Sequence, residues 1–362
     1  MDLYHAAARR TESKAPMFKS VFIPLSCGLF AAALLTGSAF RGLERPRTRF
    51  VIHVANKYGY IDRSGLIVIP PKYDLAWGFT EGLAAVYLSS RPGYIDRAGF
   101  INESGRLVIP MRFDYARAFR EGRAEIEVGD KWGFIDRSGR FVVKPHYDQV
   151  QRFKEGLAAV ELNHKWGFVD HHGREVIAPQ YDLTWGFGEG LACVWRDAKC
   201  GFVNRRNEVV IGFRFDECAG FYEGPSPVRI GQKWGYINKK GGFVVPPTYE
   251  NAWSYSEGLA PAKLNGKWGY VDPSGKVVIA PQFEDGAPRY SIGVFREGLA
   301  EVKIGSQWGF INKKGQVVIP PRFAAAFGFS NGLAEVWDPD CAYIDTSGNT
   351  VWNANHESGV NR

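Results

Sequence analysis

Methionine, cysteine and histidine are scarce in this chain of 362 residues, with 3, 5 and 7 copies respectively. Helical stripes are also missing, because past residue 50 no window of eleven or more residues keeps apolar side chains at helical spacing. Like charges never run together for five residues, so the net charge of +7 lacks the clustered cations of a nucleic-acid-binding surface. These absences argue against a helical protein and against nucleic acid as a partner.

Enzyme and cofactor motifs are absent as well. The sequence contains no G-x-S-x-G, H-E-x-x-H, G-x-x-x-x-G-K-S/T or helix-opening G-x-G-x-x-G. The pair His171-His172 lies in a predicted turn, where a solvated pair is the simpler explanation than a metal site. We therefore predict a protein that is not an enzyme, with no catalytic residues, no metal site and no cofactor.

Glycine and aromatic residues are abundant, with 42 glycines and 14% aromatics. This composition is typical of an all-β protein with many turns, or of a repeat protein. Collagen is excluded, because glycine does not occur at every third position.

The first forty residues predict a targeting segment. Residues 1–20 carry net positive charge, and residues 21–40 have no charged side chain and end in small residues before Arg41. This order is typical of a cleaved signal peptide, while the uncharged stretch is also long enough for an N-terminal membrane anchor. With residues 41–49 as a linker, both alternatives predict an extracytoplasmic protein that is secreted, periplasmic or anchored to the membrane.

From residue 50 onward one motif recurs, represented by Lys165-Trp-Gly-Phe-Val-Asp-His-His-Gly173. The glycine after its aromatic residue falls at positions 59, 99, 133, 167, 201, 235, 269 and 309. Five of the seven steps are 34 residues and two are 40. Together with a weaker copy near Cys341, this period predicts nine repeats over residues 50–352, followed by a disordered C-terminal tail at residues 353–362.

Each repeat is predicted to form a three-stranded antiparallel meander followed by a loop. In the repeat that starts at Leu157, runs of β-forming residues at 157–160, 165–170 and 175–177 are bounded by Asn, Gly and Pro. The pattern Asp170-x-x-Gly173 supplies the acceptor and the positive-φ residue of a hairpin turn. The Glu-Gly pair of each loop, such as Glu189-Gly190, is expected to bind loop amides.

The full repeat reads Lys-Trp-Gly-Phe/Tyr-Ile/Val-Asp/Asn-x-x-Gly, then Val-Val-Ile-x-Pro-x-Phe/Tyr-Asp/Glu, then Phe-x-Glu-Gly-Leu-Ala-x-Val. Residues 233–260 and 307–336 contain it almost completely. In these motifs the chain resembles the WG-repeat family of mainly bacterial proteins. The resemblance implies an all-β fold and a non-enzymatic role as an interaction or cell-surface module.

The assembly of the repeats has two alternatives. Nine blades are uncommon, a repeat of about 34 residues is short for a four-stranded blade, and no strand at one end is left to complete a repeat at the other. We therefore expect an elongated, solenoid-like array of nine three-stranded antiparallel meanders, with a propeller-like closed ring as the alternative. In both, neighbouring repeats bury one another's apolar faces.

Tryptophans outside the repeated Trp-Gly position are the candidate binding residues. Indole rings at loops and strand ends offer flat surfaces to sugars or peptide side chains, although packing against the next loop is the simpler explanation. The candidates are Trp77, Trp185, Trp253, Trp195 and Trp337.

The predicted function is that of an exported interaction protein or structural scaffold at the bacterial cell envelope. The alternative is a carbohydrate- or cell-wall-binding module that uses these tryptophans. The expected partner is therefore an unknown protein or an envelope polysaccharide, with membrane attachment only through the N-terminal segment.

Two cysteines lie on strands joined by a short turn. One hypothesis is a cross-strand disulfide between Cys193 and Cys200. The other is that Cys200, which occupies a tryptophan position of the repeat, is a buried free thiol.

Overall fold

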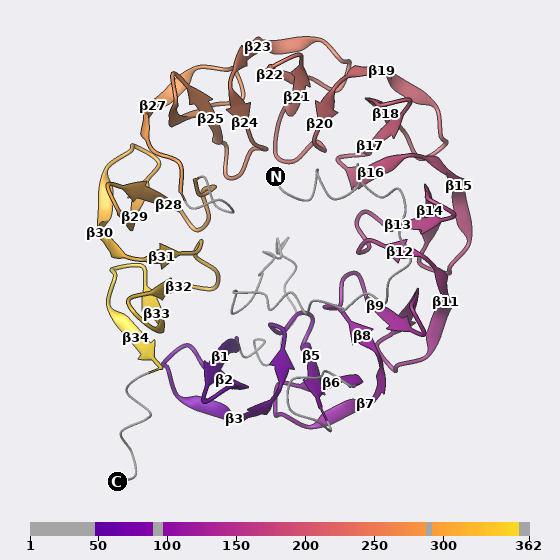
Figure 1. The fold of residues 1–362 in the computed structure, drawn as a ribbon, viewed down its shortest axis with the longest axis vertical. Helices are drawn as coiled ribbons and strands as arrows, with labels where there is room; N and C mark the ends of the chain where they lie inside the picture. Colours follow the sequence, from indigo (N-terminus) through magenta and orange to yellow (C-terminus); the bar gives the residue numbers. More distant parts are fainter. Residues whose placement is uncertain (1–47, 90–96, 287–291, 355–362) are drawn as a thin grey trace, which may run out of the picture.

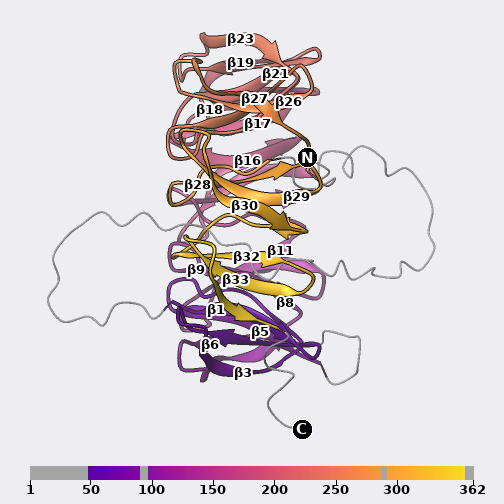
Figure 2. The ribbon, with the colours of Figure 1, turned by 90° about the vertical axis from the view of Figure 1, so that its left-hand side faces the viewer.

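The computed structural model describes residues 48–89, 97–286 and 292–354. Their 34 strands form nine antiparallel sheets, which stand around a common centre as the blades of a closed ring (Figure 1). From the side the ring is a flat disc (Figure 2). The predicted targeting segment, most of the linker and the end of the predicted tail lie outside the described residues. None of the residues that are described forms an apolar helix of bilayer-spanning length.

Strands follow one another in chain order within each blade, from the centre to the rim (Figure 1). Blades 1 to 3 contain β1 (Phe50–Val54), β2 (Lys57–Ile61), β3 (Ile67–Tyr73); β4 (Leu75–Ala76), β5 (Leu83–Leu88), β6 (Arg97–Asn102), β7 (Leu107–Phe113); β8 (Tyr115–Ala116), β9 (Arg123–Val128), β10 (Lys131–Asp136) and β11 (Phe141–Tyr147). Blades 4 and 5 contain β12 (Gln149–Val150), β13 (Leu157–Leu162), β14 (Lys165–Asp170), β15 (Glu175–Tyr181); β16 (Leu183–Gly188), β17 (Leu191–Arg196), β18 (Lys199–Val203) and β19 (Val209–Phe215).

The second half of the ring repeats the same order. Blades 6 and 7 contain β20 (Glu217–Cys218), β21 (Ser226–Ile230), β22 (Lys233–Ile237), β23 (Phe243–Tyr249); β24 (Asn251–Ala252), β25 (Ala260–Leu264), β26 (Lys267–Val271) and β27 (Val277–Phe283). Blades 8 and 9 contain β28 (Leu299–Ile304), β29 (Gln307–Asn312), β30 (Val317–Phe323); β31 (Ala325–Ala326), β32 (Leu333–Trp337), β33 (Cys341–Asp345) and β34 (Thr350–Asn353).

Seven blades have four strands in the described residues, where the sequence predicted three. The additional strand is the innermost one and is only two residues long in six of these blades, as in β12. Gln149 and Val150 pair with β13, and the amide of Gln151 extends the ladder by a 2.8 Å bond to the carbonyl of Ala159. Because this strand is so short, a 34-residue repeat suffices for a four-stranded blade, which removes the length argument against a propeller.

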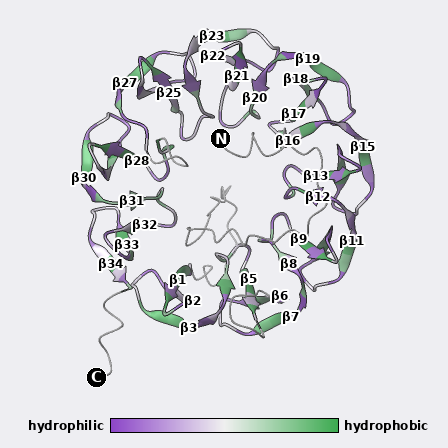
Figure 3. Cartoon of the chain, viewed as in Figure 1, coloured by the Kyte–Doolittle hydropathy of each residue, from purple (hydrophilic) through white to green (hydrophobic). Residues whose placement is uncertain are grey.

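The hydrophobic core is divided into nine clusters, and each is shared by two adjacent blades. Hydrophobic residues recur on the strands of every blade, with hydrophilic residues in the loops (Figure 3). One of the clusters joins the first and last blades, with Phe50 and Ile52 of β1 against Tyr343 of β33 and Trp352 of β34. All nine junctions of a ring are therefore filled.

Direct contacts close the seam between blades 1 and 9. The hydroxyl of Tyr343 donates a 2.8 Å hydrogen bond to the carbonyl of Val51, and the rings of Phe50 and Tyr343 lie 5.4 Å apart between centroids. The elongated array was therefore wrong, and the alternative of a closed ring is confirmed. Closure needs no exchanged strand, because side-chain packing at the seam is of the same kind as at every other junction.

The glycine of the Trp-Gly pair makes room for the backbone of the neighbouring rim strand. A Cβ atom on Gly167 would lie 2.4 Å from the carbonyl oxygen of Ile177. The register between β14 and β15 shifts at this point, between Trp166 and Phe168, so the rim strand bulges over the glycine. The flanking residues Trp166 and Phe168 are both buried.

The predicted hairpin turn is confirmed, as the first repeat shows. The carboxylate of Asp62 accepts bonds from the amide and hydroxyl of Ser64 (2.9 and 2.6 Å) and from the amide of Leu66 (3.2 Å). These bonds, that of the hydroxyl above all, hold the pKa of Asp62 below its usual value. Gly65 has φ 87°, and Asn207, which replaces the glycine in another repeat, has φ 63°.

The Glu-Gly pairs link the loops of six pairs of consecutive blades in the described residues. Glu155 of blade 4 accepts hydrogen bonds from the amides of Glu189 (2.5 Å) and Gly190 (2.9 Å) in blade 5. Equivalent bonds run from Gly122 to Glu81, Gly156 to Glu121, Glu257 to Glu223, Glu297 and Gly298 to Glu257, and Gly332 to Glu297. The expectation that these glutamates bind loop amides is confirmed, and we name the series the carboxylate hoop.

Candidate binding cavity on the inner wall

The inner wall is the surface formed by the innermost strands and the loops that follow them. In the six blades with a two-residue innermost strand, the residue directly after that strand is held by its backbone, as in the 2.9 Å bond from the Trp77 amide to the Ala85 carbonyl. Trp185 is the equivalent residue within the longer strand β16. These residues differ from blade to blade, although the strands around them are alike. This variable column consists of Trp77, Arg117, Gln151, Trp185, Ala219, Trp253 and Phe327.

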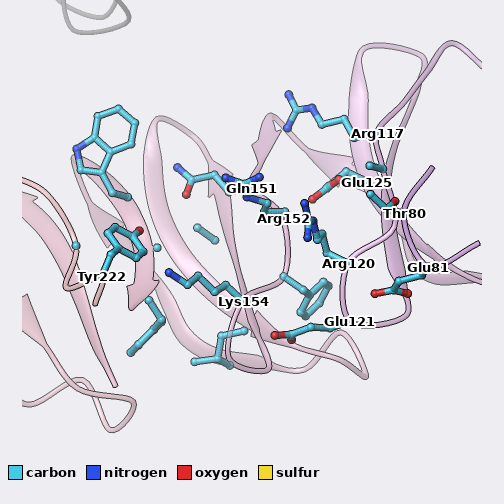
Figure 4. Close-up of a pocket in the computed structure, with 18 of the residues that line it drawn as sticks. Thr80, Glu81, Arg117, Arg120, Glu121, Glu125, Gln151, Arg152, Lys154 and Tyr222 are labelled. Carbon is cyan, nitrogen blue, oxygen red and sulfur yellow. The ribbon is translucent and has the colours of Figure 1, made fainter. Parts of the chain in front are cut away.

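A cavity of about 1240 Å³ lies on this wall, lined by residues of blades 2 to 6. Five members of the variable column line it: Trp77, Arg117, Gln151, Trp185 and Ala219. Its wall combines aromatic rings with charged side chains, several of which are visible in Figure 4. The charged lining residues are Glu81, Arg117, Arg120, Glu121, Glu125, Arg152 and Lys154.

Two of the acids are already engaged by the hoop and by neighbouring side chains. Glu81 accepts a 3.1 Å bond from the Gly122 amide and pairs with Arg137 at 3.3 Å. Glu121 accepts a 2.8 Å bond from the Gly156 amide and lies 3.0 Å from His171. Both carboxylates are therefore bound to groups of the protein itself.

The third acid, Glu125, lies at a strand position of blade 3 and is only 2% exposed. Burial raises its pKa, and the nearby guanidinium groups of Arg117, Arg152 and Arg120 oppose that rise. The pKa of Arg120 is lowered by burial and by the charge of Arg152. Figure 4 shows Arg120 and Arg152 beside Glu125.

The other two cations rest on aromatic rings. The guanidinium of Arg117 lies 4.2 Å from the ring centroid of Trp132 and donates a 2.9 Å bond to the carbonyl of Val150. The ammonium of Lys154 lies 3.5 Å from the ring centroid of Tyr222. Such contacts fix the direction of a long cationic side chain.

The structure brings two of the five predicted tryptophans, Trp77 and Trp185, into this cavity. Trp77 donates a 3.2 Å bond to the hydroxyl of Tyr87, and Trp185 packs edge to face on Trp195, which is itself buried. Trp253 lies in blade 7, in edge-to-face contact with Trp268.

The last candidate, Trp337, lies beside the seam cluster and donates a 2.9 Å bond to Glu335. Trp337, Trp195 and Trp253 do not line the cavity. The five tryptophans therefore do not form one site.

The sequence analysis missed Glu125 and Arg152, although the repeat contained a signal for both. Arg152 stands where the other repeats have small residues, with one valine: Gly78, Ala118, Gly186, Gly220, Ser254, Val294 and Gly328. Glu125 stands where two other cavity repeats have Ala85 and Ala159, and the same column contains Glu301 and Glu335 in blades 8 and 9. A comparison of columns for charged exceptions finds Arg152, and a comparison of the cavity repeats alone finds Glu125.

The predicted disulfide between Cys193 and Cys200 was wrong. Cys193 bonds to Cys218 of the next blade, with 6.7 Å between the Cα atoms, and Cys200 is a buried free thiol. The strand register places Cys193 opposite Phe202, so Cys200 is only a diagonal neighbour. The three sulfurs lie within 4.8 Å of one another, but two are joined and one thiol remains.

The fold and its nine equivalent sheets define a nine-bladed β-propeller built from one short repeat. The family model described as WG containing repeat matches eight consecutive segments, at residues 58–89, 99–132, 132–166, 166–200, 201–234, 234–268, 268–308 and 308–336. The chain belongs to the WG containing repeat family.

Solved structures resemble the chain in fold alone. A structure described as a eukaryotic initiation factor is 12% identical, covers 86% of this chain and 96% of its own, and has a TM-score of 0.60. BamB from Moraxella catarrhalis is 10% identical over 82% of this chain and 91% of its own, with a TM-score of 0.42. Virginiamycin B lyase from Staphylococcus aureus is 13% identical over 64% of this chain and 91% of its own, with a TM-score of 0.39. No curated protein matches the sequence.

Proposed function

We propose that this propeller is a non-enzymatic interaction protein that holds a segment of a partner protein on its inner wall. The observation that carries the proposal is the cavity of about 1240 Å³, because five members of the variable column line it. The volume also exceeds the roughly 300–1,000 Å³ of typical small-molecule sites.

The ring suits such a role because it is a rigid support for loops. The carboxylate hoop and the shared cores connect consecutive blades, so the inner wall is held on ordered elements. Binding to a wall that is already formed avoids the cost of ordering loops on association.

The proposal is tested by filling the cavity. Peptides are selected by phage display on the wild-type protein, and their affinities are compared with those for Ala219→Trp. This variant introduces a residue that the same column accepts at Trp77, Trp185 and Trp253. We expect at least a tenfold loss of affinity. The control Phe327→Trp changes the same column outside the cavity and should bind as the wild type does. Equal binding by all three proteins would contradict the proposal.

A carbohydrate ligand is the second candidate, favoured by the positions of Trp77 and Trp185 on the cavity wall. Indole rings stack on sugar rings. Retention on purified peptidoglycan and on a glycan array is compared for Trp77→Ala, Trp185→Ala and the control Trp253→Ala. Loss of retention in the first two alone would favour a sugar, and absence of retention by the wild type would exclude it.

We also propose that the protein acts outside the cytoplasm, at the cell envelope. The basic and then uncharged N-terminal sequence supports export, and the Cys193–Cys218 disulfide fits an oxidising compartment. Cell fractionation with mass spectrometry of the mature N-terminus tests this. A start near Phe40 indicates a cleaved signal, an intact Met1 in the membrane fraction indicates an anchor, and an intact protein among cytoplasmic proteins refutes export.

A further inference from the structure

Charged side chains gather at one place on the inner wall. Arg117, Arg120, Glu125 and Arg152 come from two consecutive blades, and all four line the same cavity. The fold does not require Arg152, because Gly186 and Gly220 occupy its column in the next two blades. Nor does it require Arg120, because the same column contains Thr80, Ser256 and Ser330 as well as the cations Lys154 and Arg296. The cluster therefore calls for an explanation other than folding.

The charges of this cluster do not balance. Within the described ranges, the guanidinium groups of Arg120 and Arg152 form no hydrogen bond or ion pair. The acids near Arg120 are Glu81 and the buried Glu125, and Glu125 also lies near Arg152. Glu81 and Glu121 are directed to backbone amides and to Arg137 and His171. Arg117 and Lys154 add two further cations. The wall thus has more positive charge than its own acids neutralise.

We propose that the cavity binds an acidic, extended peptide segment, with a carboxylate of that segment held by Arg120 and Arg152. Two guanidinium groups supply paired donors that match the geometry of a carboxylate. Trp77, Trp185 and Tyr222 line the same cavity and would contact the apolar parts of such a segment. This inference rests on the proposed function and names the chemistry of the partner.

Glu125 has a positioning role in this arrangement. Its buried carboxylate lies near both guanidinium groups and offsets part of their repulsion in the empty cavity. A bound carboxylate must compete with this charge. Removing the negative charge of Glu125 should therefore tighten binding, whereas removing Arg152 should weaken it.

The experiment measures fluorescence anisotropy of three labelled peptides of equal length, rich in Glu, Gln or Lys, against the full chain. We expect the Glu peptide to bind at least tenfold more tightly than the Gln peptide, with an affinity that falls as salt rises. Arg152→Gly and Arg120→Ser, which introduce residues of the equivalent columns, should each lower that affinity at least tenfold. Glu125→Gln should raise it several-fold, and the exposed control Arg140→Ala should leave it unchanged.

Equal affinity for the Glu and Gln peptides, or unchanged binding by Arg152→Gly, would overturn the inference. A polyuronate is measured in the same assay to represent an acidic polysaccharide. If the protein binds the polyuronate but not the Glu peptide, the inference is also overturned. If display-selected neutral peptides bind and are lost only in Ala219→Trp, the proposed interaction function stands while the acidic preference fails.

Discussion

The half-buried acid Glu301 makes the stability of this propeller depend on pH in a direction opposite to that of a salt-bridged carboxylate. Glu301 lies on β28, and its Oε2 atom is inaccessible to solvent and has no hydrogen-bond partner in the described structure. Desolvation raises its pKa from 4.5 to about 7, although a hydrogen bond from its own backbone and the charge of Arg296 oppose this rise. The perturbation that isolates the effect is Glu301→Gln, which keeps the shape and removes the charge.

The magnitude follows from linkage. Between pH 4.5 and about 7 the unfolded chain has lost the proton of Glu301 and the folded chain still holds it, so stability falls as pH rises through this window. Each pKa unit corresponds to about 1.4 kcal/mol, which gives a loss of roughly 3 kcal/mol above pH 7. Below pH 4.5 both states are protonated, and the loss disappears.

Urea unfolding at pH 4, 6 and 8 measures this effect as the difference in the free energy of unfolding between wild type and Glu301→Gln. We expect the variant to gain on the wild type as pH rises, by roughly 3 kcal/mol between pH 4 and pH 8. The exposed control Glu175→Gln should stay within about 0.5 kcal/mol at every pH. A difference between wild type and Glu301→Gln that does not change with pH would refute the reasoning.

Three further substitutions test the links between and within blades by urea unfolding. Glu155→Asn removes the carboxylate hoop contact between blades 4 and 5. Because this contact is exposed, the free energy of unfolding should fall by only about 1–2 kcal/mol. An unchanged free energy of unfolding would contradict a structural role for the hoop. Cys193→Ala removes the disulfide to Cys218, which joins residues 25 positions apart, and should lower the free energy of unfolding by about 3.5 kcal/mol. A peptide map of the wild-type protein without the linked pair would refute the disulfide. Gly167→Ala places a Cβ 2.4 Å from a rim-strand carbonyl and should cost about 1–3 kcal/mol. Gly212→Ala, which meets no atom within 4 Å, is its control and should be almost neutral.

The repeat allowed the sequence to predict what lies within one blade. The acceptor Asp62 and the positive φ of Gly65 are properties of four neighbouring residues, so the hairpin turn was predictable. The two-residue innermost strands were not, because two residues are too few to show a β pattern. Closure was not predictable either, since the bond from Tyr343 to Val51 joins residues 292 positions apart and no motif encodes the angle between blades.

The candidate site was predicted in part, for a similar reason. The variable column was visible in the sequence, and it contains Trp77 and Trp185, which line the cavity. The curvature of the ring, however, decides which members of the column meet, and it separates Trp253 from the other two. Cys218 was overlooked as the partner of Cys193 because the two residues lie in different blades, and only the packing between blades brings them together.

The central claim is that the nine blades close into a ring, and the distance between blades 1 and 9 tests it most directly. Nitroxide labels on Ser64→Cys and Ser347→Cys occupy equivalent exposed turns of these blades, in a background with Cys27→Ser. The ring predicts the same short distance as for the neighbouring pair Ser64→Cys and Ser104→Cys in blades 1 and 2. An open array predicts roughly 80 Å, because eight sheet spacings of about 10 Å would separate the end blades, and that result would contradict the account.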